Sequence, residues 1–217
     1  MAPHKEHILS LLNNYRNRVA LGYTRTLFPA ARMARMAWSK ELENFAIMYI
    51  TKCAPETRPC MSSPQFTNIG SVLDGLSFTG VYKPSIVPGL TEELLKGWFE
   101  DTRFVTRNML LHLTPDFKRK SVSRTVLLMT DRNSHVGCSG LTFVSDSVKH
   151  FRLVCTFATD NMNDLPIYKG STNPGSQCHR RDTIYKNLCA PGESYNNSHE
   201  YVEGELLQLS DDIFSIY

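Results

Sequence analysis

The stretch His135-Val136-Gly137-Cys138-Ser139-Gly140, with its counterpart Val154-Cys155-Thr156-Phe157, decides the fold. Both segments mix apolar with small or polar residues in alternation, as strands with one buried face do. The turn-prone residues Ser145-Asp146-Ser147 lie midway between the two cysteines. Because paired positions in an antiparallel ladder have a constant index sum, a hairpin about this turn places Cys138 directly opposite Cys155. Opposed Cβ atoms lie about 4.5–5.5 Å apart, near disulfide reach, so the sequence predicts a cross-linked hairpin.

Length and charge exclude several classes of protein. The 217 residues, 41% of them apolar, suffice for one large domain or one domain with an appendage. The net charge of +3 is mild, and the basic residues are dispersed apart from Lys118-Arg119-Lys120 and Arg180-Arg181, which does not favour nucleic-acid binding. No apolar run reaches the roughly 18–20 residues that cross a bilayer, so no transmembrane segment is predicted.

The six cysteines fall in three close pairs, and no C-x-x-C motif occurs. Six cysteines allow fifteen connectivities, but their spacing favours disulfides formed in an oxidising compartment over a zinc or redox site. The first residues lack the apolar core of a signal peptide. Either a leader is missing from this chain or the thiols are reduced in the cytosol, and we favour the first, hence a secreted protein. Asn196 would then be a glycosylation site, since it opens an N-x-S sequon. The pairs are Cys53 with Cys60, Cys138 with Cys155, and Cys178 with Cys189.

Periodicity predicts the main elements. Apolar residues recur at helical spacing from residue 5 to residue 21, and Gly22 is a natural helix end. Ser39 is a good N-cap for a second helix, and Thr91 for a third. The β-rich run 122–129 predicts a strand before the hairpin. This order indicates an α/β protein with layered helices and strands.

Composition divides the chain into three parts. Residues 5–160 carry the periodic segments and read as the folded domain. Residues 161–192 have little periodicity, and a staple between Cys178 and Cys189 would make them a small hinge-like extension. Residues 193–217 form a polar, acidic tail.

An ordered series of motifs between Ile8 and Cys189 resembles the CAP superfamily, which includes cysteine-rich secretory, antigen-five and pathogenesis-related proteins. The series is most similar to the insect antigen-five-like, venom-allergen branch. It comprises Asn13-x-x-Arg16-Asn17-x-Val19-Ala20-x-Gly22, Ala31-Arg32-Met33-Ala34-x-Met36-x-Trp38, Trp98-Phe99, His135-Val136-Gly137-Cys138, Leu153-Val154-Cys155-Thr156-Phe157 and Tyr185-Lys186-Asn187-Leu188-Cys189. The resemblance implies a secreted three-layer α-β-α sandwich with a cysteine-stapled C-terminal extension, and we expect a monomer.

The resemblance leaves one cysteine pair open. In insect relatives the positions of Cys53 and Cys60 pair with cysteines of an amino-terminal extension that this chain does not contain. Three options therefore remain for these two residues: they pair with each other, pair elsewhere, or stay free.

The resemblance also implies a central cleft in which two histidines and two acidic residues can hold a divalent metal. The matching positions here are Thr57, Thr67, Asp101 and Arg124, so one of the four groups is retained. A guanidinium stays protonated and cannot ligate a cation. We therefore expect no metal, no cofactor and no catalytic residue at this place, and an ion pair between Asp101 and Arg124.

These observations favour a non-enzymatic, disulfide-braced scaffold. It would present a surface to an extracellular protein partner or carry a small apolar ligand such as a lipid or sterol. One alternative is a hydrolase or protease that uses a remnant of the cleft, and another is a truncated, non-functional gene product. The identity of the partner or ligand is not encoded in any motif.

Overall fold

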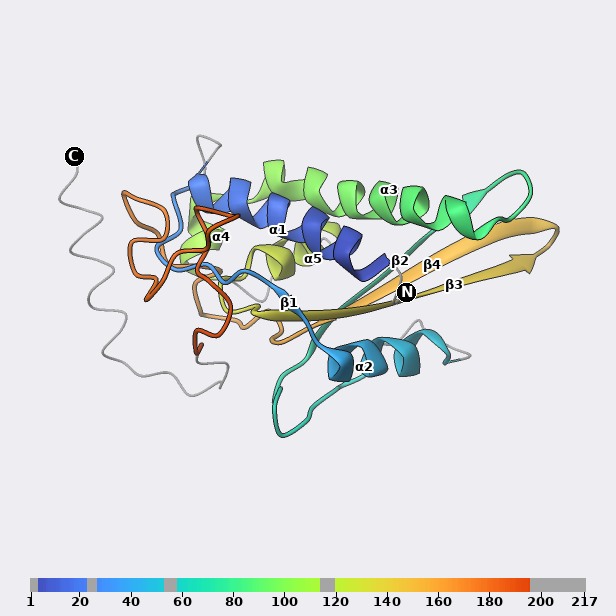
Figure 1. Ribbon diagram of the computed structural model, residues 1–217, viewed down its shortest axis with the longest axis horizontal. Coiled ribbons are helices and arrows are strands. Elements are labelled where there is room, and N and C mark those ends of the chain that lie inside the picture. The colour runs from blue at the N-terminus through green and yellow to red at the C-terminus, as the bar shows by residue number, and fades with distance from the viewer. Residues whose placement is uncertain (1–3, 23–26, 53–57, 114–119, 196–217) are drawn as a thin grey trace.

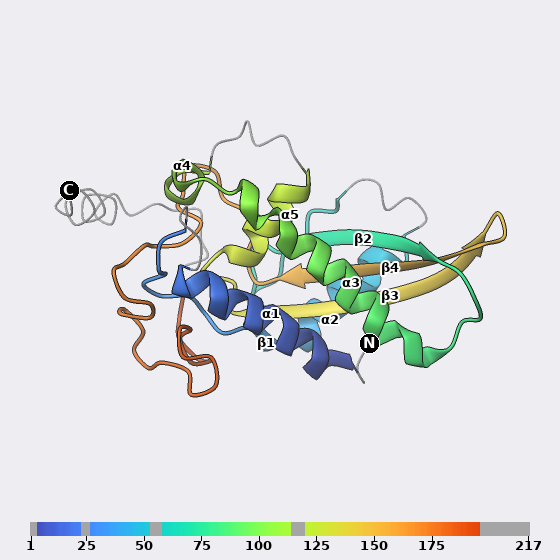
Figure 2. The same ribbon diagram turned by 90° about the horizontal axis from the view of Figure 1, so that it is seen from above.

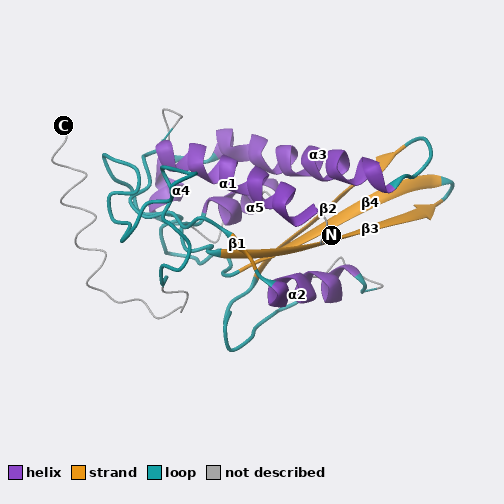
Figure 3. Ribbon diagram, in the orientation of Figure 1, coloured by secondary structure: helices purple, strands orange, loops and turns teal. Residues whose placement is uncertain are grey.

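The computed structural model describes residues 4–22, 27–52, 58–113 and 120–195. It confirms the three-layer α-β-α sandwich (Figures 1 and 3). Helices α1 (Lys5–Leu21), α3 (Val87–Glu100) and α5 (Lys120–Met129) cover one face of the sheet, and α2 (Lys40–Ile50) lies on the other. Three short helical segments complete the set: η2 (Pro84–Ile86), η3 (Asp101–Phe104) and α4 (Arg107–Leu111). Cys53, Thr57 and Asn196 lie outside the described residues.

The sheet has four strands in the order β1-β3-β4-β2. The two-residue β1 (Ala37–Trp38) runs parallel to β3 (His135–Ser145), and the remaining pairs are antiparallel. Strands β4 (Val148–Phe157) and β2 (Gly70–Phe78) pair along their whole length. Figure 2, seen from above, shows the β3–β4 hairpin reaching past the helices at one end of the molecule.

The hairpin has the predicted register. Cys138 lies opposite Cys155, with their Cα atoms 4.1 Å apart and their Sγ atoms bonded at 2.05 Å. At the turn, Asp146 and Ser147 have φ values of 50° and 65°. Two consecutive residues with positive φ match a two-residue turn of the type whose twist suits antiparallel strands.

Helix α2 approaches the sheet closely because position 137 is a glycine. A Cβ atom on Gly137 would lie 2.5 Å from the carbonyl carbon of Leu42. The hydroxyl of Thr156, on the neighbouring strand, donates to the carbonyl of Leu42 at 2.7 Å. Ser39 caps α2 as predicted, with its side chain accepting from the amide of Leu42. The helix therefore buries the face of β4 that the alternating pattern would leave half-exposed.

Two element predictions are wrong. The run 122–129 lies in helix α5, because almost every side chain along it is buried between α3 and the sheet, and a continuous apolar run does not distinguish a helix from a strand. The third helix begins at Val87, with Pro88 in its first turn, rather than at Thr91. Thr91 is instead fully buried within that helix.

Arg16 of helix α1 is wholly buried in the core. Its guanidinium donates to four backbone carbonyls that lie in two separate parts of the chain, one before β1 and one at the end of α5. Those carbonyls belong to Ala34 (3.0 Å), Leu128 (2.7 Å), Thr130 (2.9 Å) and Asp131 (3.2 Å). Burial lowers the pKa of Arg16 to about 10, so the side chain still carries its charge at neutral pH.

Two asparagines of α1 attach neighbouring segments. The side-chain amide of Asn13 donates to the carbonyl of Met36, and its oxygen accepts from the amide of Met36 at 2.8 Å. The side-chain oxygen of Asn17 accepts from the backbone amide of Asn187, in the extension, and the side-chain amide of Asn187 donates to the backbone carbonyl of Asn17. A second disulfide, Cys178–Cys189, closes that extension. The Asn13, Arg16 and Asn17 motif is thus a set of docking groups on one helix.

The extension is tied to the domain at Asp131. The amide of Lys169 donates to the Asp131 carboxylate at 3.2 Å, and the amide of Asp131 donates to the carbonyl of Ile167. The carboxyl is buried, and loss of hydration raises its pKa, an effect that Arg132 partly opposes.

We predict that Gly137→Ala lowers the free energy of unfolding by about 2–3 kcal/mol, because the added methyl group meets the backbone of α2. Gly97→Ala is the matched control: Gly97 lies on the exposed side of α3, with nothing within 4 Å of the added Cβ. It should gain about 0.5–1 kcal/mol from helix propensity. Urea unfolding measures both, and equal stability of Gly137→Ala and the natural protein would contradict the close approach.

We predict that Asp131→Asn flattens the pH dependence of stability. The folded protein holds the Asp131 proton more tightly than the unfolded chain does, so its stabilisation is complete below about pH 4 and is lost as pH rises through the raised pKa. Asparagine keeps an acceptor for the Lys169 amide without titrating. Relative to the variant, the natural protein should therefore lose stability with rising pH, measured by urea unfolding. A gap that is constant with pH would count against this.

Candidate functional site

The cleft position that the sequence singles out holds an ion pair. Asp74 of β2 pairs with the guanidinium of Arg124 of α5. The same carboxylate oxygen accepts a hydrogen bond from the indole of Trp98, on α3, at 2.9 Å. The ionic side chains are 30% and 27% exposed, so solvent reaches both. The Nε atom of Arg124 is buried and has no hydrogen-bond partner among the described residues.

The expected partner of Arg124 is wrong. Asp101 begins the short η3 turn after α3, whereas Asp74 projects from the helix-facing side of the sheet, in register with Leu153. Val72 and Leu76 are on the same face and pack with the core. A carboxylate at a core-facing strand position needs a partner that compensates its charge. The acidic residue within the apolar run around Asp74 was therefore the sequence feature that pointed to an ion pair.

A second ion pair lies near the start of β2. Arg58 pairs with Asp160, and its Nε donates to the hydroxyl of Ser71 at 3.1 Å. The next residue, Asn161, donates to the carbonyl of Ser123 at 2.9 Å, which joins this loop to α5. No local pattern in the sequence predicts this pair, because residues 58 and 160 are brought together only by the fold.

Of the other predicted cleft positions, Thr57 lies outside the described residues. Thr67 is exposed in the loop before β2. His135, at the start of β3, contacts the hydroxyl of Ser134 and packs beside the ring of Phe66. Burial lowers the pKa of His135, which favours its neutral form. Its neighbours indicate a structural role.

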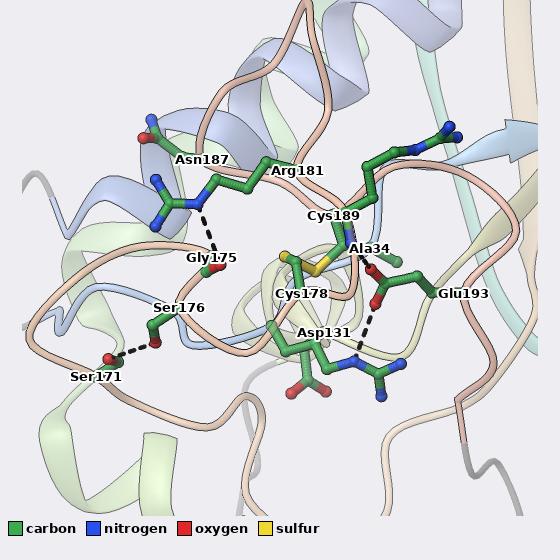
Figure 4. Close-up of a disulfide and its surroundings, with 12 residues drawn as sticks. Ala34, Asp131, Ser171, Gly175, Ser176, Cys178, Arg181, Asn187, Cys189 and Glu193 are labelled. Carbon is green, nitrogen blue, oxygen red and sulfur yellow. Dashed lines mark hydrogen bonds and ion pairs between the residues drawn. A yellow bond between two sulfur atoms is a disulfide. The ribbon is translucent and has the colours of Figure 1, made fainter.

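One cluster in the described part of the chain has three potential metal-ligating side chains close together: Cys178, Cys189 and Glu193. Figure 4 shows that the two sulfurs are bonded to each other and that Glu193 faces an arginine. That arginine is Arg32, whose Nε lies 3.0 Å from the carboxylate. Neither a thiolate nor a free carboxylate is left for a cation.

The groups at the cleft position are therefore poorly suited to metal binding and to proton transfer. The carboxylates there are committed to guanidinium groups, which have no lone pair for a metal and do not exchange protons near neutral pH. What this position offers to a ligand is fixed charge and hydrogen-bond donors on a rigid support. This donor set does not fit a divalent metal.

A family model for CAP, the cysteine-rich secretory protein family, matches residues 9–157. The chain belongs to the CAP family. Among curated CAP proteins, Tabinhibitin 1 and Tablysin 15 of Tabanus yao are each 31% identical to it over 191 residues, covering 88% of this chain and 73% of theirs. These relatives agree with the insect branch indicated by the motifs.

Solved CAP structures share the fold. BmVAL-1 superposes with a TM-score of 0.67 at 17% identity, covering 89% of this chain and 96% of that one. NaASP2, solved with Zn²⁺, gives a TM-score of 0.63 at 24% identity, with 85% and 93% covered. The Hookworm Platelet Inhibitor gives 0.59 at 18% identity, with 90% and 94% covered.

Two further findings concern membrane-spanning helices and a cysteine outside the two disulfides. In the described ranges, no helix has the length and apolar character that crossing a membrane requires. Cys60 is exposed and forms no disulfide within the part of the chain that the structure describes.

We predict that Asp74→Ala destabilises the protein by about 1–2 kcal/mol, because Arg124 and the Trp98 indole both lose their acceptor. Asp101→Ala, which removes a carboxylate of the same kind from the neighbouring turn, should change stability by less than about 0.5 kcal/mol. Urea unfolding of the two variants decides between the partners. The reverse order would reinstate Asp101 as the partner of Arg124.

Proposed function

We propose that this chain is a non-enzymatic, extracellular CAP protein that acts by binding another extracellular protein. One observation carries the proposal: at the matched cleft position Arg124 pairs with Asp74, whose carboxylate also accepts from the Trp98 indole, so these groups bind one another rather than a metal. The two disulfides, Cys138–Cys155 and Cys178–Cys189, support an oxidising compartment. On this proposal the surface of the scaffold performs the function.

The relatives support this choice of partner class. Several carry the name Tabinhibitin, and one structural neighbour is a platelet inhibitor of hookworm. A protein that inhibits by binding needs a rigid surface rather than a reactive centre, and loops on a stiff scaffold provide such a surface. The division into a CAP domain at 5–160, an extension at 161–192 and a tail at 193–217 remains part of the proposal, as do the monomeric state and glycosylation at Asn196.

The apolar-ligand alternative has less support. Met33 and Met36, which could have lined a lipid groove, are fully buried in the core. Met48 of α2 is 54% exposed, on a helix whose opposite side packs against the sheet. The methionines thus do not converge on one apolar surface.

We expect zinc titration by calorimetry to detect no stoichiometric micromolar site, because guanidinium groups occupy the ligand position. NaASP2, whose structure contains Zn²⁺, is the positive control under the same buffer. A stoichiometric site in this chain that Asp101→Ala abolishes would refute the proposed loss of metal binding. Retained binding after that substitution would place the metal elsewhere.

A further inference from the structure

The end of the molecule farthest from the cysteine-stapled extension is formed by two loops (Figures 1 and 2). One is the β2–α3 loop, residues 79–85, and the other is the turn region of the β3–β4 hairpin, residues 144–149. We call these two segments together the distal tip. Its apolar side chains are unusually exposed: Val81 76%, Val144 66%, Val148 44% and Tyr82 42%.

The two loops form one surface. The ammonium group of Lys149 donates to the carbonyl of Gly80, and Phe78 pairs with Lys149 in the sheet register. The hairpin turn has the two positive φ values of a tight turn. The β2–α3 loop continues through η2 into α3, which begins at the buried Val87. The distal tip therefore protrudes from the domain but is attached to it through the sheet and α3. Its exposed valines are not buried against the rest of the domain, so they do not stabilise its fold.

Charge is distributed around the apolar residues. Within residues 79–85 and 144–149 the charged side chains are Lys83, Lys149 and Asp146. Lys83 is exposed and makes no ion pair with any described residue. Asp146 lies at the outer turn, where its carboxylate accepts from the Ser145 hydroxyl. Two cations and one anion give the tip a net positive charge beside its valines and tyrosine.

We propose that the distal tip docks on a lipid surface that carries anionic headgroups. A protruding tip with apolar side chains at its end can enter the headgroup boundary, where apolar burial and attraction of lysine to anionic lipid add together. Tyrosine favours that boundary because its ring is apolar and its hydroxyl is polar. Exposed apolar patches of this kind on soluble proteins mark interaction sites.

Lipid is favoured over a protein pocket by shape and composition. A protein pocket would require complementary walls around a surface that here comes from two separate loops facing outwards. A fluid lipid interface needs no such complementarity, and the single carboxylate of Asp146 at the turn is outweighed by the two lysines of the tip. The proposal is independent of the cleft and of the extracellular protein partner.

Co-sedimentation with sucrose-loaded vesicles tests the proposal. The full chain should bind vesicles of phosphatidylcholine with about 30% phosphatidylserine, and bind pure phosphatidylcholine much less. The double variant Val81→Asp/Val144→Asp should bind the mixed vesicles at least about tenfold more weakly, since two apolar side chains no longer enter the interface. Raising the salt from about 0.1 M to about 0.5 M should also weaken binding.

The matched control is Ile184→Asp. Ile184 is 67% exposed, as much as the valines, but belongs to the extension at the opposite end of the molecule. It should leave vesicle binding unchanged, and thermal unfolding should show all variants folded. Equal loss in the control and the double variant, or no binding of the natural chain to mixed vesicles, would overturn the proposal and leave a protein as the ligand of the tip. Neither result bears on the zinc titration.

Discussion

The buried guanidinium of Arg16 is the interaction on which the architecture depends. One side chain on α1 satisfies carbonyls at the end of α5, in the loop that follows it and in the segment before β1. Its charge is offset by four acceptors. Without it the buried carbonyls of Ala34 and Leu128 would lose a partner, which costs more than a hydrogen bond contributes, whereas those of Thr130 and Asp131 still accept from the amides of Asn133 and Ala34. Because Asp131 also binds the backbone at Ile167 and Lys169, the same centre orients the extension.

A second constraint acts on the other face of the sheet. The absence of a side chain at Gly137 lets α2 lie against β3, and the Cys138–Cys155 bond cross-links β3 to β4 at the adjacent position. The hairpin is thereby held firmly at its base, while its turn projects beyond both helical layers. The cross-link at the base and the exposure at the tip act together, because a projecting surface binds more tightly when its support is held in place.

The residues at the matched cleft position lie apart from the contacts that hold the layers together. Arg124 cannot take the place of a metal ligand, yet its ion pair with Asp74 and the indole of Trp98 fills the position with compatible charge. Arg58 and Asp160 form a second ion pair, near the start of β2. The layers are held by Arg16, Gly137 and the disulfides, none of which belongs to the cleft, so the cleft residues can change independently.

Local signals in the sequence were sufficient for the helix that ends at Gly22, the cap at Ser39 and the hairpin turn at Asp146, because each depends on neighbours in the chain. They failed at residues 122–129, where β-rich composition was overridden by burial on nearly every side of a helix. The predicted helix start at Thr91 was also wrong, since a residue that caps helices well can also be buried inside a longer helix. By itself the sequence determined the family and the register of Cys138 with Cys155. Only the tertiary structure decided that Arg124 meets Asp74 and that Lys149 binds the carbonyl of Gly80, because such contacts depend on how distant segments pack and not on their spacing along the chain.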